Sequence, residues 1–453
     1  MKLKTLIQNC NRLEVAEIEI EFIPGIPQIH FLGLPDRIIK ESFYRIKSAL
    51  KSSGYKFPLT SQMIVNIKPN HLRKSSRGLE FAVALGILLK TDQIDSSRIK
   101  EDWVLYGELG LDGNVYEPSD LLPSEALLRD YKILTGIGFE SSCFRLENLK
   151  DIEINFTENK KKFKRPAAGL NRLYTDEEAE FLFLAATTKL HGLLAGDSGA
   201  GKSTLAFSLN SFLPEPDSDS DIRFEHLWRP VVAPHHSISP AAFLGGGQNL
   251  FEGELERVRG GILLLDEFSQ FSPEILESLR GPMTGEKLRL SRGAFHREFS
   301  SDFQVVATTN LCPCGKWTPL KRNVSCRFTR AKCTKYLEKF SGPLLDRFGI
   351  LLFTHVKQDR KVRGADILLR VQSCLARQKN SAVAIAPKLL DNYYATLSTR
   401  RKNFLNQVAA VYAFERNAQG SSGELAPEVS LEDYNKAERW VIRPFELLEK
   451  GMG

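Results

Sequence analysis

The sequence predicts an α/β protein with a parallel-sheet domain, which follows a smaller α+β domain and precedes a mostly helical segment. Three observations support this prediction. Strand and helix patterns alternate from Leu173 to about Val356, as they do in parallel sheets. A glycine-rich loop motif begins at Gly196, after an apolar strand and before a helical pattern. The residues before about Glu140 mix strand patterns with a helix, and those after Val356 are mostly helical in pattern.

The length of 453 residues is sufficient for two or three domains. We expect the α+β domain at residues 1–145, a linker at 146–172, the α/β core at 173–356 and the helical segment at 357–453. The linker contains the basic run NKKKFKR just before Pro166. Such a run is typical of a solvated connection, although it could also contact nucleic acid.

Composition and charge narrow the class of protein. Hydrophobic residues make up 42% of the chain, which fits a folded globular protein. No run approaches the roughly 18 apolar residues of a membrane-spanning helix, and the N-terminal segment soon turns charged. We therefore expect a cytoplasmic protein without a membrane segment. The net charge of +7, from 62 basic and 55 acidic residues, is compatible with a nucleic-acid partner but does not establish one.

Two strands, a helix and a hairpin are predicted in the N-terminal domain. The alternating segments EVAEIEIEF and QMIVNIK indicate strands. Between them, PDRIIKESFYRIKSALKSSG indicates an amphipathic helix that stops at Gly54. Its apolar face contains Ile38, Ile39, Phe43, Ile46 and Leu50. The segment YGELGLDGNVY indicates a hairpin with Asp112 and Gly113 in the turn.

The segment HGLLAGDSGAGKSTLAFSL carries the spacing of a phosphate-binding loop. Glycines let backbone N–H groups close around a phosphate, the lysine supplies charge to the β- and γ-phosphates, and the serine hydroxyl is a ligand for Mg²⁺. We therefore predict binding of a nucleoside triphosphate, ATP, by Gly196, Asp197, Ser198, Gly199, Ala200, Gly201, Lys202, Ser203 and Thr204.

Two further strand patterns end in polar residues that suit phosphoryl transfer. GILLLDEF ends in Asp266, which we expect to hold Mg²⁺ with Ser203, and Glu267, which we expect to activate the attacking water. FQVVATTN ends in Asn310, whose amide could orient that water. Thr308 and Thr309 are equally polar neighbours. Because parallel strands end at one edge of a sheet, these side chains should meet beside the loop.

Several segments together resemble the Mg-chelatase-like AAA+ ATPases of the ComM (YifB) family. They are RPVVAPHHSISPAAFLGGG, ILLLDEF, LESLRGPMTGEKLRLSR, ATTNLCPCG and FSGPLLDRFGI, and the N-terminal segments GLPDRIIKESFYRIKSALKSSGYKFP, VNIKPNHLRK and GELGLDG. The resemblance implies a P-loop AAA+ core with a helical lid, after a Lon-protease-like domain of the ribosomal S5 domain 2-like fold. It further implies a ring, expected to be a homo-hexamer, that uses ATP to translocate on DNA and drive branch migration in recombination and natural transformation.

The same resemblance assigns roles to basic residues. It makes Arg347 an arginine finger that reaches the neighbouring subunit's γ-phosphate, and Arg400 a sensor-2 arginine. It places Lys287, Arg289 and Arg292 on a pore hairpin that grips DNA phosphates. A surface ion pair or a solvated hairpin is the alternative in each case. One departure is informative: Gly78 stands where Lon-like proteases carry their serine nucleophile, so we expect no peptidase activity.

Four of the seven cysteines lie between positions 312 and 333. A cluster of this kind in a cytoplasmic chain favours a structural Zn²⁺ site, with Cys312, Cys314, Cys326 and Cys333 as ligands. Related family members carry a Cys-x-Cys pair at a position where Phe328 follows Cys326 here, so the set could also be incomplete. The alternatives are reduced thiols in a structural loop and a redox switch.

Three functions remain open from the sequence. The first is a DNA motor of helicase or branch-migration type, with ATP and Mg²⁺ bound between subunits. The second is a ring that remodels a partner protein, as the motor subunit of magnesium chelatase does. The third is a nucleotide-gated scaffold with little turnover. A DNA motor differs from the others because its affinity for DNA should fall steeply with salt.

Overall fold

The structure is a computed structural model of the chain, and it divides into two compact units that are each described by themselves. The first unit ends at Phe163, and the second comprises Lys164–Pro216 and the residues from Trp228 onward. The division at Phe163 therefore lies inside the predicted linker. The residues described are 2–9, 12–26, 28–32, 37–58, 60–68, 78–95, 99, 102–118, 127, 131–137, 144–152, 157–158, 163–216, 228–246, 251–292, 295–299, 301–315, 328–329, 332–333, 336, 342–355, 359–380, 394–417 and 428–452.

The first unit is built on an eight-stranded mixed sheet with the strand order β10-β9-β8-β5-β1-β2-β4-β3. Its strands and helices are β1 Lys2–Asn9, β2 Arg12–Pro24, β3 Ile29–Leu32, α1 Arg37–Ser52, β4 Ser61–Lys68, α2 Leu79–Lys90, β5 Trp103–Leu105, β6 Glu108–Leu109, β7 Val115–Tyr116, β8 Lys132–Thr135, β9 Phe144–Arg145 and β10 Thr157–Glu158. The two predicted strands are confirmed as β2 and β4, which pair antiparallel. The predicted α+β class of this region is therefore what the structure has.

The helix predicted in this unit is confirmed as α1. Ile46 and Leu50 are fully buried, and Phe43 packs against the core. The chain leaves the helix at Ser52, and Gly54 adopts a left-handed φ of 86°, as its predicted role as a stop requires. The predicted hairpin is also present, with Gly113 at φ 87° between β6 and β7. Helix α2 is buried along its length from Leu79 to Leu89.

The start of α2 is closely packed. Gly78 precedes the helix, and a β-carbon at this position would lie 2.1 Å from the buried ring of Tyr106. Glu80, in the first turn, accepts hydrogen bonds from the Leu109 backbone N–H at 2.9 Å and from the Ser42 hydroxyl at 2.8 Å. Burial raises the pKa of this carboxyl. The space at the helix start is thus filled by Tyr106 and by the β6–β7 hairpin.

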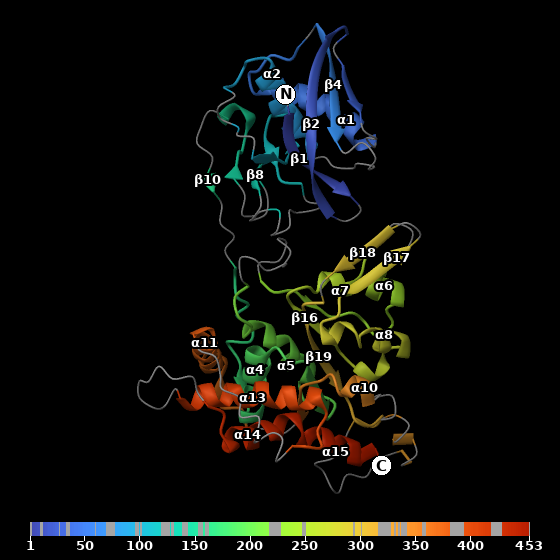
Figure 1. Ribbon diagram of the computed structural model, residues 1–453, viewed down its shortest axis with the longest axis vertical. Helices are drawn as coiled ribbons and strands as arrows, with labels where there is room; N and C mark the ends of the chain where they lie inside the picture. The colour runs from blue at the N-terminus through green and yellow to red at the C-terminus, as the bar shows by residue number, and fades with distance from the viewer. Residues whose placement is uncertain are drawn as a thin grey trace. The chain divides into compact units, whose positions relative to one another are not determined.

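The second unit contains a five-stranded parallel sheet with the order β13-β16-β19-β12-β20 (Figure 1). These strands are β12 Gly192–Gly196, β13 Val231–Val232, β16 Ile262–Leu265, β19 Gln304–Thr309 and β20 Ile350–Thr354. The four-residue β16 and the six-residue β19 are buried at every position, which is typical of parallel strands covered on both faces. The predicted parallel α/β core is therefore confirmed.

Helices and short strands surround this sheet. In chain order they are β11 Leu173–Tyr174, α4 Asp176–Thr188, α5 Lys202–Ser208, α6 Pro240–Leu244, β14 Gly245–Gly246, β15 Phe251–Glu252, α7 Glu254–Arg257, α8 Pro273–Ser278, β17 Leu288–Arg292, β18 Phe295–Phe299, α10 Gly342–Leu345, β21 Val362–Arg363, α11 Gly364–Asn380, α13 Thr399–Asn417, α14 Leu431–Val441 and α15 Arg443–Met452. Short 3₁₀ turns lie at Leu209–Ser211, Phe268–Gln270 and Pro282–Thr284 in this unit, and at Leu149–Asp151 in the first unit.

Buried polar side chains fix the amino ends of the central strands. His191, just before β12, accepts a hydrogen bond from the Val305 backbone N–H at 3.0 Å and donates from Nε2 to the Met283 carbonyl at 2.9 Å. Burial lowers the pKa of His191 to about 4, so the ring stays neutral. The Gln304 amide donates to the carbonyls of Ala185 and Leu190. The two strands are thereby held in register at the edge opposite the predicted site.

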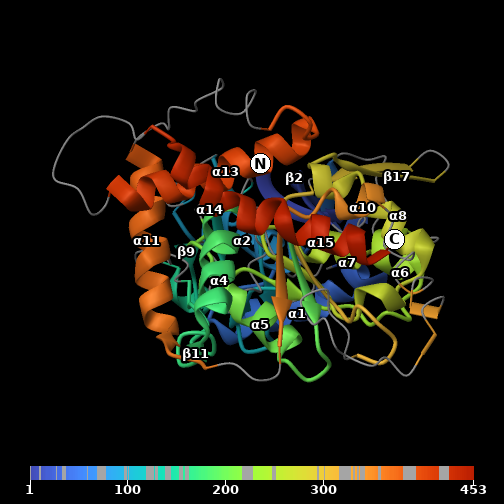
Figure 2. The ribbon, with the colours of Figure 1, turned by 90° about the horizontal axis from the view of Figure 1, so that it is seen from below.

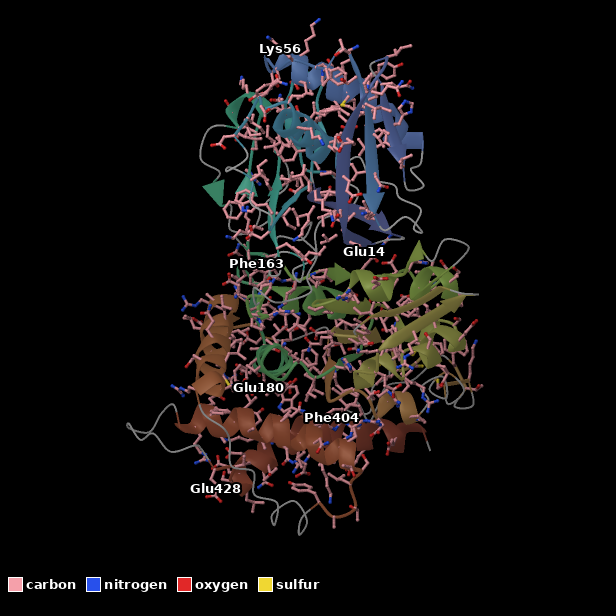
Figure 3. The ribbon with its side chains drawn as sticks, turned by 45° about the horizontal axis from the view of Figure 1, so that its top comes forward. Glu14, Lys56, Phe163, Glu180, Phe404 and Glu428 are labelled. Carbon is pink, nitrogen blue, oxygen red and sulfur yellow. The ribbon has the colours of Figure 1, made fainter. Side chains whose placement is uncertain are left out.

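The helices that follow the sheet pack on α4 through an ionic network. The Arg370 guanidinium of α11 binds Glu180 of α4, with an Nη1 to Oε2 distance of 2.5 Å, and also binds Glu415 of α13. It lies 3.8 Å from the ring centre of Phe183. Figure 2 shows α13 beside α14, and Figure 3 labels Glu180 in this region. Among the described helices, none has the length and apolar composition needed to cross a membrane.

Candidate functional site

The predicted phosphate-binding loop connects β12 to α5. Gly196, Gly199 and Gly201 have φ values of 144°, 78° and 86°, which L-residues with side chains rarely adopt. Gly196 also lies against β20, because a β-carbon there would be 2.2 Å from the Thr354 carbonyl oxygen. The loop borders a cavity of about 370 Å³ that is lined by Ser198, Gly199, Gly201, Lys202, Ser203, Thr204, Asp266, Glu267, Thr308, Thr309 and Asn310. Asp197 and Ala200 are buried beneath the loop.

Lys202 is held at the floor of this cavity. Its ammonium group donates to the carbonyls of Gly196 at 3.1 Å and Asp197 at 2.7 Å, and to the Asn310 side-chain oxygen at 2.9 Å. Burial lowers the lysine pKa, and the nearby carboxylates of Asp197, Asp266 and Glu267 oppose that shift. The predicted partners Lys202 and Asn310 are thus in direct contact, although 108 positions separate them.

Asp266 lies where a magnesium ligand is predicted. Its Oδ1 atom accepts a hydrogen bond from the Ser203 hydroxyl at 2.8 Å and another from the Thr308 hydroxyl. A carboxylate beside a serine hydroxyl is a hard oxygen donor set, which suits Mg²⁺. Ser203 and Asp266 are therefore the residues that would hold the ion, at the edge of the phosphate cavity.

Glu267 has an unusual backbone conformation. Its φ and ψ angles are 54° and 48°, in the left-handed region that non-glycine residues seldom occupy. Its backbone N–H donates to the Thr308 hydroxyl at 3.2 Å, and its side chain is exposed to the cavity that Asp266 also lines. Such strain persists where surrounding contacts impose it, and it is common at functional sites. The Glu267 side chain is thus exposed at the cavity, whereas that of Asp266 is half-buried.

The two arginines assigned by the family resemblance lie elsewhere in the same unit. Arg347 donates from Nε to the Arg280 carbonyl at 2.5 Å and from Nη1 to the Pro343 carbonyl at 2.6 Å. Burial lowers its pKa, and the positive charges of Arg400 and Arg280 lower it further. Arg400 binds Asp346, with Nη1 2.6 Å from Oδ2. Neither arginine lines the phosphate cavity. The two arginines therefore lie near each other and away from the phosphate-binding loop.

The cysteine-rich segment contacts the phosphate-binding loop directly. The Ser198 backbone N–H donates to the Gly315 carbonyl at 2.8 Å. Within the segment, the Cys312 sulfur lies 3.2 Å from the sulfurs of both Cys314 and Cys333. The described part of this segment therefore forms a compact thiol cluster that is coupled to the loop.

The zinc prediction is not supported by the described part of the chain. Sulfur ligands about 2.3 Å from a tetrahedral zinc ion are about 3.8 Å apart, which exceeds the 3.2 Å distances between these thiols. Across the described residues, no group of three or more His, Cys, Asp or Glu side chains could hold a metal ion. Cys326, the fourth predicted ligand, lies outside the described residues.

The predicted DNA-gripping residues lie at the β17–β18 hairpin, which stands at the rim of the second unit (Figure 1). Lys287 precedes β17 and Arg289 lies within it, and both are exposed. Arg289 is opposite Glu298 in the pairing register. Arg292 pairs through its backbone position with Phe295, and its side chain lies outside the described ones.

Sequence reasoning missed two residues at the site, Thr308 and Gly315, and one buried structural arginine, Arg401. Thr308 joins Asp266 to the Glu267 backbone, although the sequence offered it only as an equal of Thr309 and Asn310. Gly315 binds the loop across more than a hundred positions. Arg401, beside Arg400, is buried and donates to the Phe348 and Val441 carbonyls. The position of Thr308 at the end of β19 could have indicated its role. No feature of the sequence indicated the contacts of Gly315 and Arg401.

A parallel sheet with a phosphate-binding loop after β12 and acids after β16 defines a P-loop NTPase fold. A family model described as "Magnesium chelatase, subunit ChlI" matches residues 173–362, and one described as "Subunit ChlI of Mg-chelatase" matches residues 18–135. Competence protein ComM of Haemophilus influenzae is 30% identical over 377 residues, which cover 74% of this chain and 72% of ComM. The chain belongs to the ComM (YifB) family of Mg-chelatase-like AAA+ proteins.

Other relatives agree with this assignment. YifB of Salmonella typhimurium is 29% identical over 370 residues, which cover 74% of this chain and 72% of YifB. A Mycobacterium tuberculosis protein is 29% identical over 382 residues, which cover 76% of this chain and 74% of that protein. Membership of the family indicates an ATPase that uses ATP and Mg²⁺.

Proposed function

We propose that this protein is an ATP-driven DNA motor, which works as a hexameric ring and couples hydrolysis to translocation and branch migration in recombination and natural transformation. The observation that carries the proposal is the single cavity where Lys202, Ser203, Asp266, Glu267 and Asn310 meet. The relative ComM is named a competence protein, which supports a role in DNA processing. Such a role would place the protein in the cytoplasm.

The cavity supports phosphoryl transfer from ATP to water. Lys202 neutralises the β- and γ-phosphates once nucleotide replaces the loop carbonyls as its partner. Mg²⁺ held by Ser203 and Asp266 would neutralise charge on the phosphates. Glu267 accepts a proton from the attacking water, because its carboxylate faces the open side of the cavity. Asn310 releases Lys202 and orients the water.

The positions of Arg347 and Arg400 support the proposal of a ring. Arg347 and Arg400 lie near Asp346 and do not line their own phosphate cavity, as a role at a neighbouring subunit's phosphates would require. Arg347 would act as the arginine finger at the neighbour's γ-phosphate. Asp346 binds Arg400 and keeps the two cations close together. A sensor-2 role for Arg400 would then also operate between subunits.

The remaining parts have proposed roles as well. The first unit would be the Lon-protease-like domain, and α11, α13, α14 and α15 would form the helical lid. The exposed Lys287 and Arg289, with Arg292, would grip DNA phosphates from the hairpin without reading bases.

The test is steady-state ATP hydrolysis with no DNA and with single-stranded, duplex and branched DNA, each at two salt concentrations. We expect DNA to stimulate turnover and the stimulation to fade with salt, because phosphate contacts release counterions. Glu267→Gln should bind ATP and stop hydrolysis. The Arg347→Ala variant, whose altered residue lies outside the cavity, should also bind ATP. Its turnover should fall by a factor of about 10³.

Other results would redirect the proposal. Turnover that ignores every DNA would favour a protein-remodelling ring, an outcome in keeping with family models named for a magnesium chelatase subunit. Normal hydrolysis by Glu267→Gln would refute the assigned role of that carboxylate. Wild-type turnover that barely exceeds that of Glu267→Gln would favour a nucleotide-gated scaffold.

A further inference from the structure

A second, smaller cavity adjoins the phosphate cavity. It is lined by Arg172, Leu173, Tyr174, Glu178, Gly201, Leu205 and Arg360. Gly201 lines both cavities. If the γ-phosphate of a bound nucleotide lies at Asp266 and Glu267, the nucleoside must leave the loop at its other side. The second cavity borders the loop at Gly201 and is placed to receive that part of the nucleotide.

The second cavity is closed in this structure. Its free space of about 10 Å³ holds little more than one water molecule, which is far too small for a purine ring. The Arg360 guanidinium spans it. Arg360 donates from Nε and Nη2 to the two carboxylate oxygens of Glu178, at 3.2 and 3.1 Å. The same Nη2 lies 3.7 Å from the position of a β-carbon on Gly201.

The Glu178 and Arg360 side chains of this ion pair differ in how freely they can move. The Glu178 side chain is 5% exposed and belongs to a capping box at the start of α4. In that box the Thr175 N–H donates to Glu178 at 3.1 Å, and the Glu178 N–H donates to the Thr175 hydroxyl at 3.0 Å. The Arg360 side chain is 41% exposed. Arg360 can therefore swing into solvent, whereas Glu178 stays where the helix start holds it.

The backbone near Arg360 is also fixed. The Lys361 N–H donates to the Tyr174 carbonyl at 2.9 Å, and the Gly364 N–H donates to the Arg172 carbonyl at 2.9 Å. These bonds tie β21 to β11, which forms the outer wall of the cavity. Opening the cavity therefore requires a side-chain rotation of Arg360 and no separation of these strands.

We propose that Arg360 is a latch that closes the nucleoside end of the nucleotide site through its ion pair with Glu178. The inference rests on the proposed function, because it takes the phosphate cavity to be a nucleotide site. Nucleotide enters when the guanidinium leaves Glu178, and the latch re-forms after release. Because only the open form accepts the nucleoside, the apparent dissociation constant is raised by the inverse of the open fraction.

The experiment compares mant-ADP binding to the wild type and to Arg360→Gln, by equilibrium fluorescence and by stopped flow. The expected result is a dissociation constant lowered about three- to tenfold, through faster association, since a partly exposed ion pair shifts an equilibrium by about that factor. Arg363→Gln is the matched control. Arg363 lies three positions away in β21, is 72% exposed, and pairs with Asp366 outside both cavities. Its dissociation constant should stay within about twofold of the wild type.

A second variant keeps the test independent of Arg360 itself. Glu178→Gln should tighten binding in the same way, because glutamine also serves in a capping box but cannot form the ion pair. Unchanged binding in Arg360→Gln would overturn the latch. Weaker binding would do so as well, because it would make Arg360 a contact of the nucleotide. If neither the wild type nor the variants bind mant-ADP, the proposed function fails and the latch fails with it.

Discussion

Helices α2 and α5 each follow an N-terminal glycine, Gly78 and Gly201, and these two glycines are needed for different reasons. Gly78 has the ordinary angles φ −59° and ψ −9°, but a β-carbon there would meet the Tyr106 ring at 2.1 Å. Gly201 has a φ of 86°, and a β-carbon there would come no closer than 3.7 Å to Arg360. Packing requires the first glycine, and backbone conformation requires the second.

The start of α2 is filled by neighbouring side chains, whereas the start of α5 borders a cavity. At α2, the acid that could serve a nucleophile is Glu80, and it is already bound by Leu109 and Ser42. The Gly78 position has no room for a side chain unless the Tyr106 ring moves. At α5, the space beyond the glycine is the phosphate cavity. A helix N-terminus therefore becomes a site only where packing leaves it open.

The largest effect is expected on stability, at the closely packed start of α2. Gly78→Ala should destabilise the first unit by about 3 kcal/mol, because the new methyl group must displace a fully buried aromatic ring. Hydrogen exchange of the α2 amides measures this locally. Gly54→Ala is the control in the same unit, since it has a left-handed φ but no heavy atom within 4 Å. Equal losses in both variants would contradict the packing argument. Nucleotide binding should not change.

A smaller effect is expected at the start of α5, where nucleotide affinity should fall more than stability. Gly201→Ala should weaken mant-ADP binding at least about tenfold, or about 1.4 kcal/mol, because the altered residue borders both the phosphate cavity and the second cavity. Its cost in stability should be only about 1 kcal/mol, from the left-handed φ. Gly285→Ala is the matched control, with φ 81°, open surroundings and a place outside the phosphate cavity. It should lose the same stability and keep its affinity, and a similar loss of affinity would count against the assignment.

The smallest effect concerns Glu267, whose left-handed backbone resembles that of Gly201. Glu267→Gly should raise the free energy of unfolding by about 0.5 kcal/mol relative to Glu267→Ala, because glycine removes the strain at φ 54° and part of that gain is lost to unfolded-chain entropy. Both variants should lack ATP hydrolysis. Denaturant unfolding of the second unit measures the difference. If the alanine variant is the more stable one, the left-handed conformation at this position carries no strain.

The sequence was most informative where chemistry is local. The glycines of the loop and the acids after β16 follow from short motifs, and the structure brings them into one cavity. The parallel core followed from alternating patterns and from the buried runs of β16 and β19. Helix α2 was not predicted, because it is buried on all sides and shows no amphipathic period.

Contacts between distant segments could not be predicted. Glu178 and Arg360 are 182 positions apart, and nothing near either residue indicates the other. The same holds for Ser198 and Gly315, whose contact depends on the path of the chain after β19. Likewise, the sequence treated Arg400 and Arg401 as equivalent basic residues. Both arginines pair with Asp346, and what distinguishes Arg401 is its burial beside Phe445, whose ring centre lies 4.1 Å from the guanidinium.

The ionic network around Arg370 has a mechanical consequence. Arg370 joins α11 to both α4 and α13, so this ion-pair network links the three helices. Helix α4 has 13 residues, which makes it a rod about 20 Å long, and its first turn carries Glu178 at the wall of the second cavity. A displacement of α11 or α13 would therefore be passed along α4 to Glu178. In that case α4 would act as a lever arm between the outer helices and the proposed latch.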